Sequence, residues 1–201
     1  WIRLNRVIRD IPISYISGGC AQPNLREDLR RKAHCKCIRC REIKGRVIDP
    51  SNITLVHRSY LASHGVEHFL SFESRDQKIL IAFLRLRIQN VPFPMLPELV
   101  HSALIRELHV YGNLSAHYIS QTNHCQHMGL GSRLLRHAEL IAISHGFRTL
   151  TVIAGVGVRE YYEKRNYKIL TKHGYLQKKI PIIVFIYKWF VAQFNYILRI
   201  A

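Results

Sequence analysis

The middle of the chain alternates between apolar and polar positions with the two-residue period of half-buried β-strands. The alternation is clearest from Phe83 to Ile88, and turn-forming residues separate the successive runs. The pattern therefore predicts strands over residues 53–60, 66–72, 78–88 and 105–111.

In the last of these strands the period places functional side chains together. Successive side chains of a strand point to opposite faces, so one face is predicted to carry Ile105, Glu107, His109 and Tyr111. The opposite face would carry Arg106, Leu108 and Val110. Three functional side chains on one face indicate a cleft, and an ordinary polar sheet face is the alternative.

From Leu130 the apolar period changes to that of a helix, with Leu130, Leu134, Leu135, Ala138, Ile141 and Ala142 on one side. A β-branched strand over 149–154 follows, and a right-handed crossover makes it parallel to the strand before the helix. A short helix over 158–164, a last strand from residue 166 and an early helix over 25–32 complete the prediction. The fold class is therefore α/β of the α+β type, with a mixed, mostly antiparallel sheet and flanking helices.

The turn before the long helix has the spacing Q-x-x-G-x-G, from Gln126 to Gly131. Two glycines let the backbone approach a bulky anion closely, because neither carries a Cβ. A glycine turn that opens a helix is a favourable pyrophosphate site, since unpaired N–H groups and the helix dipole both attract negative charge.

The last stretch, residues 180–201, is nearly continuous in apolar side chains and follows Lys178 and Lys179. It is almost long enough to cross a bilayer, but Lys188, Gln193 and Asn195 count against a clean span. Three interpretations stay open: a spanning segment, an interfacial or partner-bound helix, and a helix packed on the domain.

Composition narrows the class of protein. With 201 residues, 48% of them hydrophobic, the chain can form one sizeable core and is not of disordered type. The net charge of +17 suits a polyanion such as RNA, DNA or an anionic membrane, although a generally basic proteome is an alternative. The chain begins at Trp1 with no signal peptide, which predicts a cytoplasmic or organellar protein that is not secreted.

Three of the five cysteines, Cys35, Cys37 and Cys40, lie within six residues. This C-x-C-x-x-C spacing is poor for disulfides and good for a metal ion held by thiolates, and it indicates a reducing compartment. A tetrahedral site needs a fourth ligand, for which the candidates are Cys20, His34, His57 or a residue before Trp1. Three free cysteines in a loop are the alternative.

The surrounding stretch from Arg26 to Arg46 holds nine Lys or Arg residues and three acids. It is predicted to face phosphates, with a merely solvated surface as the alternative. The candidate RNA-binding residues are Arg26, Arg30, Arg31, Lys32, Lys36, Arg39 and Arg41.

The order of strand, Q-x-x-G-x-G turn, helix, strand and tyrosine resembles GNAT acetyltransferases. The resemblance becomes more specific in 35–42 (CKCIRCRE), 84–87 (LRLR), 106–112 (RELHVYG) and 155–162 (GVGVREYY). These motifs are similar to the zinc loop and acetyltransferase domain of the Elongator catalytic subunit family. The resemblance divides the chain into the end of a radical-SAM domain (1–31), a zinc-binding linker (32–46), a GNAT domain (47–176) and a foreign apolar tail (177–201).

The resemblance implies binding of acetyl-CoA and zinc, and modification of tRNA at C5 of the wobble uridine. The radical-SAM barrel, with its iron–sulfur cluster and SAM, is expected before Trp1, as part of this protein or as another chain or subunit. Two alternatives stay open: a stand-alone GNAT that acetylates proteins, and a non-catalytic tRNA-binding remnant.

The same resemblance points to the residues of the site. Tyr161 or Tyr162 would protonate the departing CoA thiolate, and Glu107 and His109 are candidate general bases. A break in strand pairing near Leu108 to Tyr111 would free a backbone N–H for the thioester carbonyl. The predicted cofactor-binding residues are Leu108, Val110, Gln126, His127, Met128, Gly129, Leu130, Gly131, Ser132, Gly155, Tyr161 and Tyr162.

Overall fold

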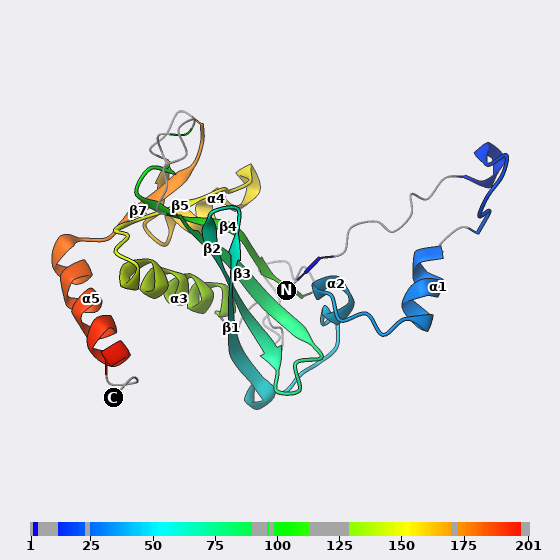
Figure 1. Ribbon diagram of the computed structural model, residues 1–201, viewed down its shortest axis with the longest axis horizontal. Coiled ribbons are helices and arrows are strands. Elements are labelled where there is room, and N and C mark those ends of the chain that lie inside the picture. Colours follow the sequence, from blue (N-terminus) through cyan, green and yellow to red (C-terminus); the bar gives the residue numbers. More distant parts are fainter. Residues whose placement is uncertain are drawn as a thin grey trace.

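The computed structural model describes residues 2–3, 12–22, 25–89, 96, 99–112, 129–169 and 173–197. Within these ranges, seven strands form one sheet in the order β1-β2-β3-β4-β5-β7-β6 (Figure 1). The strands are β1 (Ile53–Ala62), β2 (Gly65–Ser74), β3 (Leu80–Ile88), β4 (Ser102–Val110), β5 (Thr149–Val152), β6 (Lys168–Ile169) and β7 (Leu176–Lys179).

The pairing confirms the predicted fold class. The strands β1 to β4 form an antiparallel meander, β4 and β5 are parallel, and β5–β7 and β7–β6 are antiparallel. The connection between the parallel pair passes through α3 (Leu130–Ser144), as the helical period predicted. Strand β7 was not predicted, and it lies between β5 and β6, so the expected domain boundary after residue 176 falls inside a sheet strand.

Helix α3 covers one face of the sheet and supplies much of the core. Its side chains at helical spacing, among them Leu130, Leu134 and Ala138, are fully buried against Leu84, Ile105 and Leu150 of the strands. Burial of this apolar stripe stabilises the fold, since each large aliphatic side chain that is buried contributes roughly 1.5–3 kcal/mol.

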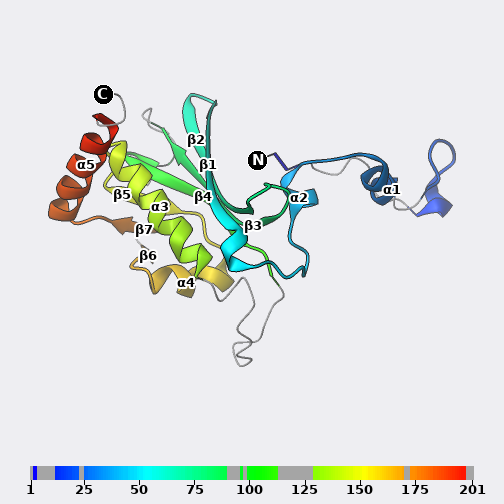
Figure 2. The same ribbon diagram turned by 90° about the horizontal axis from the view of Figure 1, so that it is seen from below.

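The opposite face of the sheet carries a smaller cluster, and the two helices α2 and α3 lie on either side of the sheet (Figure 2). Helix α2 (Ile38–Arg41) places Ile38 on Phe69, Leu80 and Phe83. The segment after it joins the sheet through the Ile43 N–H, which donates to the carbonyl of Leu80 at 3.1 Å. The cysteine loop is therefore fixed to the sheet.

The remaining short helices connect these parts. Helix α1 (Leu25–Lys32) stands away from the sheet in Figure 1, and the 3-10 helices η1 (Ile13–Tyr15) and η2 (Pro50–Asn52) lie in connections. The helix predicted over 158–164 is α4 (Arg159–Glu163), and the 3-10 helix η5 (Val156–Val158) precedes it.

The apolar tail forms helix α5 (Ile182–Ile197), which packs on α3. Phe185 and Trp189 contact the core, and Gln193 donates to the carbonyl of Ser144 at 3.2 Å. Its outer side leaves Ile183, Tyr187 and Phe190 exposed. Among the described residues no helix is both long and apolar enough to span a membrane.

A β-bulge in β4 corrects the predicted division of its faces. Arg85 pairs with Glu107 and the next residue, Leu86, pairs with Ile105, so Arg106 is an extra residue in β4. Ile105 consequently lies in the core under α3, and Arg106 does not share the face of Leu108 and Val110. This bulge in the pairing of β3 with β4 comes just before residues 108–111, where a break in strand pairing was predicted.

Candidate active site

The site begins where β4 and β5 separate. Their parallel pairing extends only from Ser102 with Thr149 to Ile105 with Val152, whereas β4 continues to Val110. Backbone N–H groups alternate between the edges of a strand, and the Tyr111 N–H donates to the carbonyl of Ile81 in β3 at 2.9 Å. The N–H groups of Leu108 and Val110 are therefore directed toward the β5 side, where no described strand pairs with them.

The N-terminus of α3 adjoins this open edge. Gly129 caps the helix in the left-handed conformation with φ of 65°, and no side chain caps the first turn, which contains no acid. Leu130 is buried in the core, so it offers only its backbone. The predicted binding residues Gln126, His127 and Met128 lie outside the described residues.

Tyr161 of α4 reaches the first turn of α3. Its hydroxyl oxygen lies so close to Gly131 that a Cβ on that residue would overlap it, and the same Cβ would lie 3.4 Å from Cγ2 of Val110. Gly131, Val110 and Tyr161 thus meet where the strands separate. Gly155 is exposed just after the end of β5.

The two adjacent tyrosines have different environments. Tyr162 is buried in the core under α3, and burial, followed by the neighbouring Tyr161, raises the pKa of its phenol to about 12. The two rings are nearly perpendicular, at 89°. Only Tyr161 is therefore placed at the open edge.

The sequence interpretation missed Arg165, which holds Tyr161 from the other side. Its guanidinium lies 3.6 Å from the centroid of the Tyr161 ring and donates to the Tyr161 carbonyl at 2.6 Å. Nε and Nη2 donate to Oγ of Ser132 at 3.0 and 2.8 Å. No short motif signals this contact, because it joins α3 to the turn after α4.

The other candidate catalytic residues lie on the opposite face of β4. Glu107, His109 and Tyr111 line a pocket of about 270 Å³ together with Ile38 and other residues of the cysteine-loop side. Glu107 accepts from Nε of Arg85 at 3.1 Å, and the rings of His109 and Tyr111 are 4.4 Å apart. Burial, followed by nearby Glu42 and Glu107, raises the pKa of the Tyr111 phenol to about 12.

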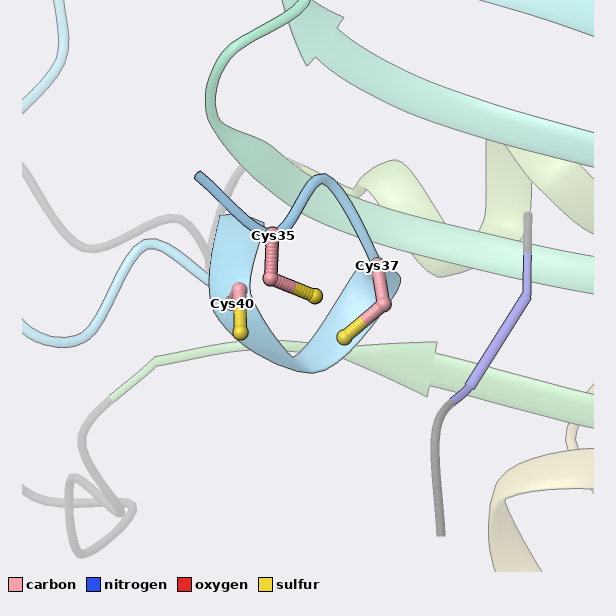
Figure 3. A group of neighbouring side chains, drawn as sticks. All are labelled: Cys35, Cys37 and Cys40. Atoms are coloured by element: carbon pink, nitrogen blue, oxygen red, sulfur yellow. The ribbon is translucent and has the colours of Figure 1, made fainter. Parts of the chain in front are cut away.

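The three clustered cysteines converge, as their spacing predicted. The sulfur atoms of Cys35, Cys37 and Cys40 all lie within 4.8 Å of one another in the loop that enters α2 (Figure 3). Three thiols at this separation fit a soft divalent ion. Burial, with hydrogen bonds among the three thiols, raises the pKa of Cys40 to about 11, and a bound cation would reverse this by favouring the thiolate.

None of the suggested fourth ligands within the chain joins this group in the described ranges. Cys20 is exposed in the N-terminal segment. His57 instead forms a hydrogen bond through Nε2 with Nδ1 of His68, at 2.9 Å.

The predicted RNA-binding residues are dispersed over the cysteine-loop side. Lys32 is exposed, and Arg31 is exposed but pairs with Asp28. Lys36 lines a cavity of about 720 Å³ that also has Arg58, Arg75 and Lys78 in its wall. Arg39 is exposed at the other pocket, and the side chains of Arg26 and Arg30 lie outside the described residues.

Arg41 instead connects the cysteine loop to the sheet. Its Nη1 donates to Oε2 of the fully buried Glu73 at 2.8 Å, and Arg58 donates to the same carboxylate. Burial alone would raise the pKa of Glu73, but the hydrogen bonds from Arg58, Ser71 and Arg41 outweigh burial and lower it. An ionised Glu73 therefore joins two arginines beneath the cysteine loop.

The parallel β4–β5 pair that separates beside a glycine-capped helix, within an otherwise antiparallel sheet, defines the class of protein: this is the GNAT acetyltransferase fold. Comparison with known proteins narrows this class. By its sequence the chain is homologous to part of Elongator complex protein 3 and of tRNA uridine(34) acetyltransferase, which confirms the predicted resemblance.

The supporting matches are substantial. The chain is 42% identical over 182 residues to the tRNA uridine(34) acetyltransferase of Methanocaldococcus infernus, covering 84% of this chain and 34% of that protein. It is 39% identical over 181 residues to Elongator complex protein 3 of Schizosaccharomyces pombe, covering 84% and 33%. The chain thus spans about a third of the length of these relatives, and no family model matches it.

A solved structure agrees with the sequence matches. The archaeal Methanocaldococcus infernus Elp3 with its residues 1–46 deleted superposes with a TM-score of 0.73 at 38% identity. The match covers 90% of this chain and 45% of that one. The structural superposition therefore agrees with the sequence matches.

Proposed function

We propose that this chain is the acetyl-CoA-binding, acyl-transfer part of a tRNA wobble-uridine-modifying enzyme. The observation that carries the proposal is the placement of the Tyr161 hydroxyl against Gly131 and Val110, at the edge where β4 and β5 separate. The relatives named tRNA uridine(34) acetyltransferase supply the substrate.

In this proposal the first turn of α3 holds the CoA pyrophosphate. Its unpaired N–H groups and the positive end of the helix dipole favour an anion, and the open space beside Gly129 lets the anion approach the backbone. The Ser132 hydroxyl and the Arg165 guanidinium lie beside the same turn and add donors. The open edge of β4 would then bind the pantetheine arm through backbone groups of Leu108 and Val110.

Tyr161 is the proposed general acid. Its phenol O–H can transfer a proton to the departing thiolate as the bond from the acyl carbon to sulfur breaks. A freed N–H on the β4 edge would stabilise the carbonyl oxygen in the transition state. Tyr162 is excluded from this role because its ring is packed in the core.

The acceptor would approach from the opposite face of β4. Glu107 and His109 line the pocket there and are the candidate general bases for an acceptor proton. The exposed cations around the same pocket and the larger cavity beside it suit an RNA backbone. Radical chemistry with SAM and an iron–sulfur cluster is assigned to a partner domain or subunit.

Zinc is the proposed ion for Cys35, Cys37 and Cys40. The three thiols match its preference for sulfur ligands, and as a structural ion it would hold the loop closed over α2. In this chain the loop supports Ile38 and Arg39, which line the acceptor pocket.

The test is acetyl-CoA hydrolysis by the purified chain, measured with and without tRNA and with a lysine peptide. Stimulation by tRNA, lost in Tyr161→Phe and kept in Tyr162→Phe, is the expected result. Acetylation of the peptide without any response to tRNA would favour a protein acetyltransferase instead. Equal activity of the two tyrosine variants would remove Tyr161 from the mechanism.

A further inference from the structure

The bulge in β4 gives Arg106 an unusual position. Because Arg106 is the extra residue between Ile105 and Glu107, its side chain turns to the face that carries Glu107 and the acceptor pocket. In a regular strand Arg106 and Glu107 would lie on opposite faces of the sheet. Bulges often re-aim a side chain beside a functional site.

A buried carboxylate holds Arg106 in this position. Nη1 of Arg106 donates to Oε1 of Glu67 at 2.6 Å, and the Glu67 side chain is only 3% exposed. The same oxygen accepts from Nη1 of Arg87 at 2.9 Å. Glu67 Oε2 is buried and has no hydrogen-bond partner among the described residues. The carboxylate therefore binds both guanidinium groups through Oε1.

The two arginines differ in what their other donors do. Arg87 is buried, and it also donates to the carbonyls of Ala62 and Ser63 and to Gln89. Arg106 is 48% exposed and, within the described ranges, forms only the bond to Glu67. Two guanidinium charges thus share one carboxylate, and the excess positive charge sits on the exposed member.

We propose that Arg106 is a binding site for a backbone phosphate of the acceptor RNA, with Glu67 as its positioning residue. A guanidinium presents several donors in a planar fork that matches phosphate oxygens, and it stays charged throughout the accessible pH range. Arg106 lies three residues before His109 in β4, and its side chain is on the face proposed for the acceptor. The inference rests on the proposed function, because it supplies the RNA.

The experiment measures the binding of unfractionated tRNA to the 201-residue chain over a series of salt concentrations. Arg106→Gln is compared with Arg136→Gln, which removes the same charge from the exposed side of α3. One lost phosphate contact reduces the slope of log affinity against log salt by about 1, and affinity at moderate salt by about tenfold. Arg136→Gln is expected to keep the slope of the unchanged chain.

Two further variants separate binding from folding. Arg106→Lys keeps the charge and loses the fork, so we expect the slope to be kept and affinity to fall by a smaller factor. Acetyl-CoA affinity is expected to be unchanged in Arg106→Gln, which shows that the domain remains folded. Glu67→Gln should weaken tRNA binding, because it removes the carboxylate that holds the Arg106 side chain in place. Adding Arg106→Gln to the Glu67→Gln variant should weaken tRNA binding no further.

The outcomes are distinguishable. A normal salt slope in Arg106→Gln, with tRNA binding intact, overturns this inference and leaves the proposed function standing. Equal losses in Arg106→Gln and Arg136→Gln would reduce the effect to net charge and also overturn it. If the unchanged chain binds no tRNA, the RNA part of the proposed function fails and takes this inference with it.

Discussion

The hydroxyl of Tyr161 occupies the space that a side chain on Gly131 would need. Tyr161 comes from α4 and Gly131 from the first turn of α3, so the contact fixes the relative position of two elements at the open edge of β4. Arg165 holds the tyrosine ring against this contact from the other side.

Gly131→Ala should disable the site without unfolding the domain. The added Cβ overlaps the Tyr161 oxygen and displaces it, and a displacement of about 1 Å in an active site can lower the rate by about 100-fold. Turnover of acetyl-CoA is the measurement, and circular dichroism reports the fold.

The matched control compares Tyr161→Phe alone with the double variant that carries both Tyr161→Phe and Gly131→Ala. Removing the oxygen relieves much of the overlap, so Gly131→Ala in the Tyr161→Phe background should cost much less than in the unchanged chain. Two fully additive losses would contradict the steric explanation.

Arg165→Gln should lower turnover by about tenfold while changing thermal stability little. The cation over the Tyr161 ring and the bonds to Ser132 are lost, and such contacts are individually of modest strength. Ser132→Ala, which removes only the hydroxyl, should show a smaller loss. Full activity in both variants would show that Tyr161 is held by packing alone.

Glu73→Gln should be strongly destabilising. The fully buried carboxylate joins Arg41 of the cysteine loop to Arg58 of β1, and removing one partner of a buried ion pair costs about 3–5 kcal/mol. Urea unfolding measures the loss, and Glu163→Gln, at an exposed acid of α4 outside this network, serves as control. Similar midpoints for the two variants would contradict the anchoring role.

The cysteine cluster should bind about one zinc ion per chain, measured by elemental analysis. Cys37→Ser removes a ligand, and we expect loss of the metal and a fall in melting temperature on the order of 5–10 °C. Cys20→Ser is the control, since that thiol lies outside the group. Metal content that depends equally on Cys20 would overturn the proposed ligand set.

The free energy of unfolding should decrease as pH falls below 6.5. Burial, and after it the charges of His57 and His145, lowers the pKa of His68 to about 4. Between about pH 4 and pH 6.5 the unfolded chain therefore binds more protons at this residue than the folded chain does. The contribution of neutral His68 to the free energy of unfolding is therefore fully present above pH 6.5. Below that pH it decreases by up to about 1.4 kcal/mol per pH unit. Denaturant midpoints across this range provide the measurement.

The variant His68→Phe should flatten that pH profile, because a ring of similar shape remains and the titrating group is gone. His101→Asn, at an exposed turn position, should leave the profile unchanged. An unaltered slope in His68→Phe would assign the effect to other groups.

Elements with local patterns could be predicted from the residues alone. The strands of the meander, the stripe of α3 and the parallel crossover follow from periods of two and 3.6 residues, and the cysteine group follows from spacing within one loop. The short strand β7 was not predicted, because its four residues of mixed polarity show no two-residue hydrophobic period. They form a strand because they pair with β5 on one side and β6 on the other.

The contacts between side chains from different elements became visible only in the folded chain. One extra residue in β4 moved Ile105 into the core and Arg106 to the acceptor face, because a period-two pattern shifts by one face wherever a bulge is inserted. Packing likewise separated Tyr161 from Tyr162 and brought Arg165 to Ser132 across two elements. Such contacts depend on distances between segments far apart in the chain, which no local pattern of residues contains.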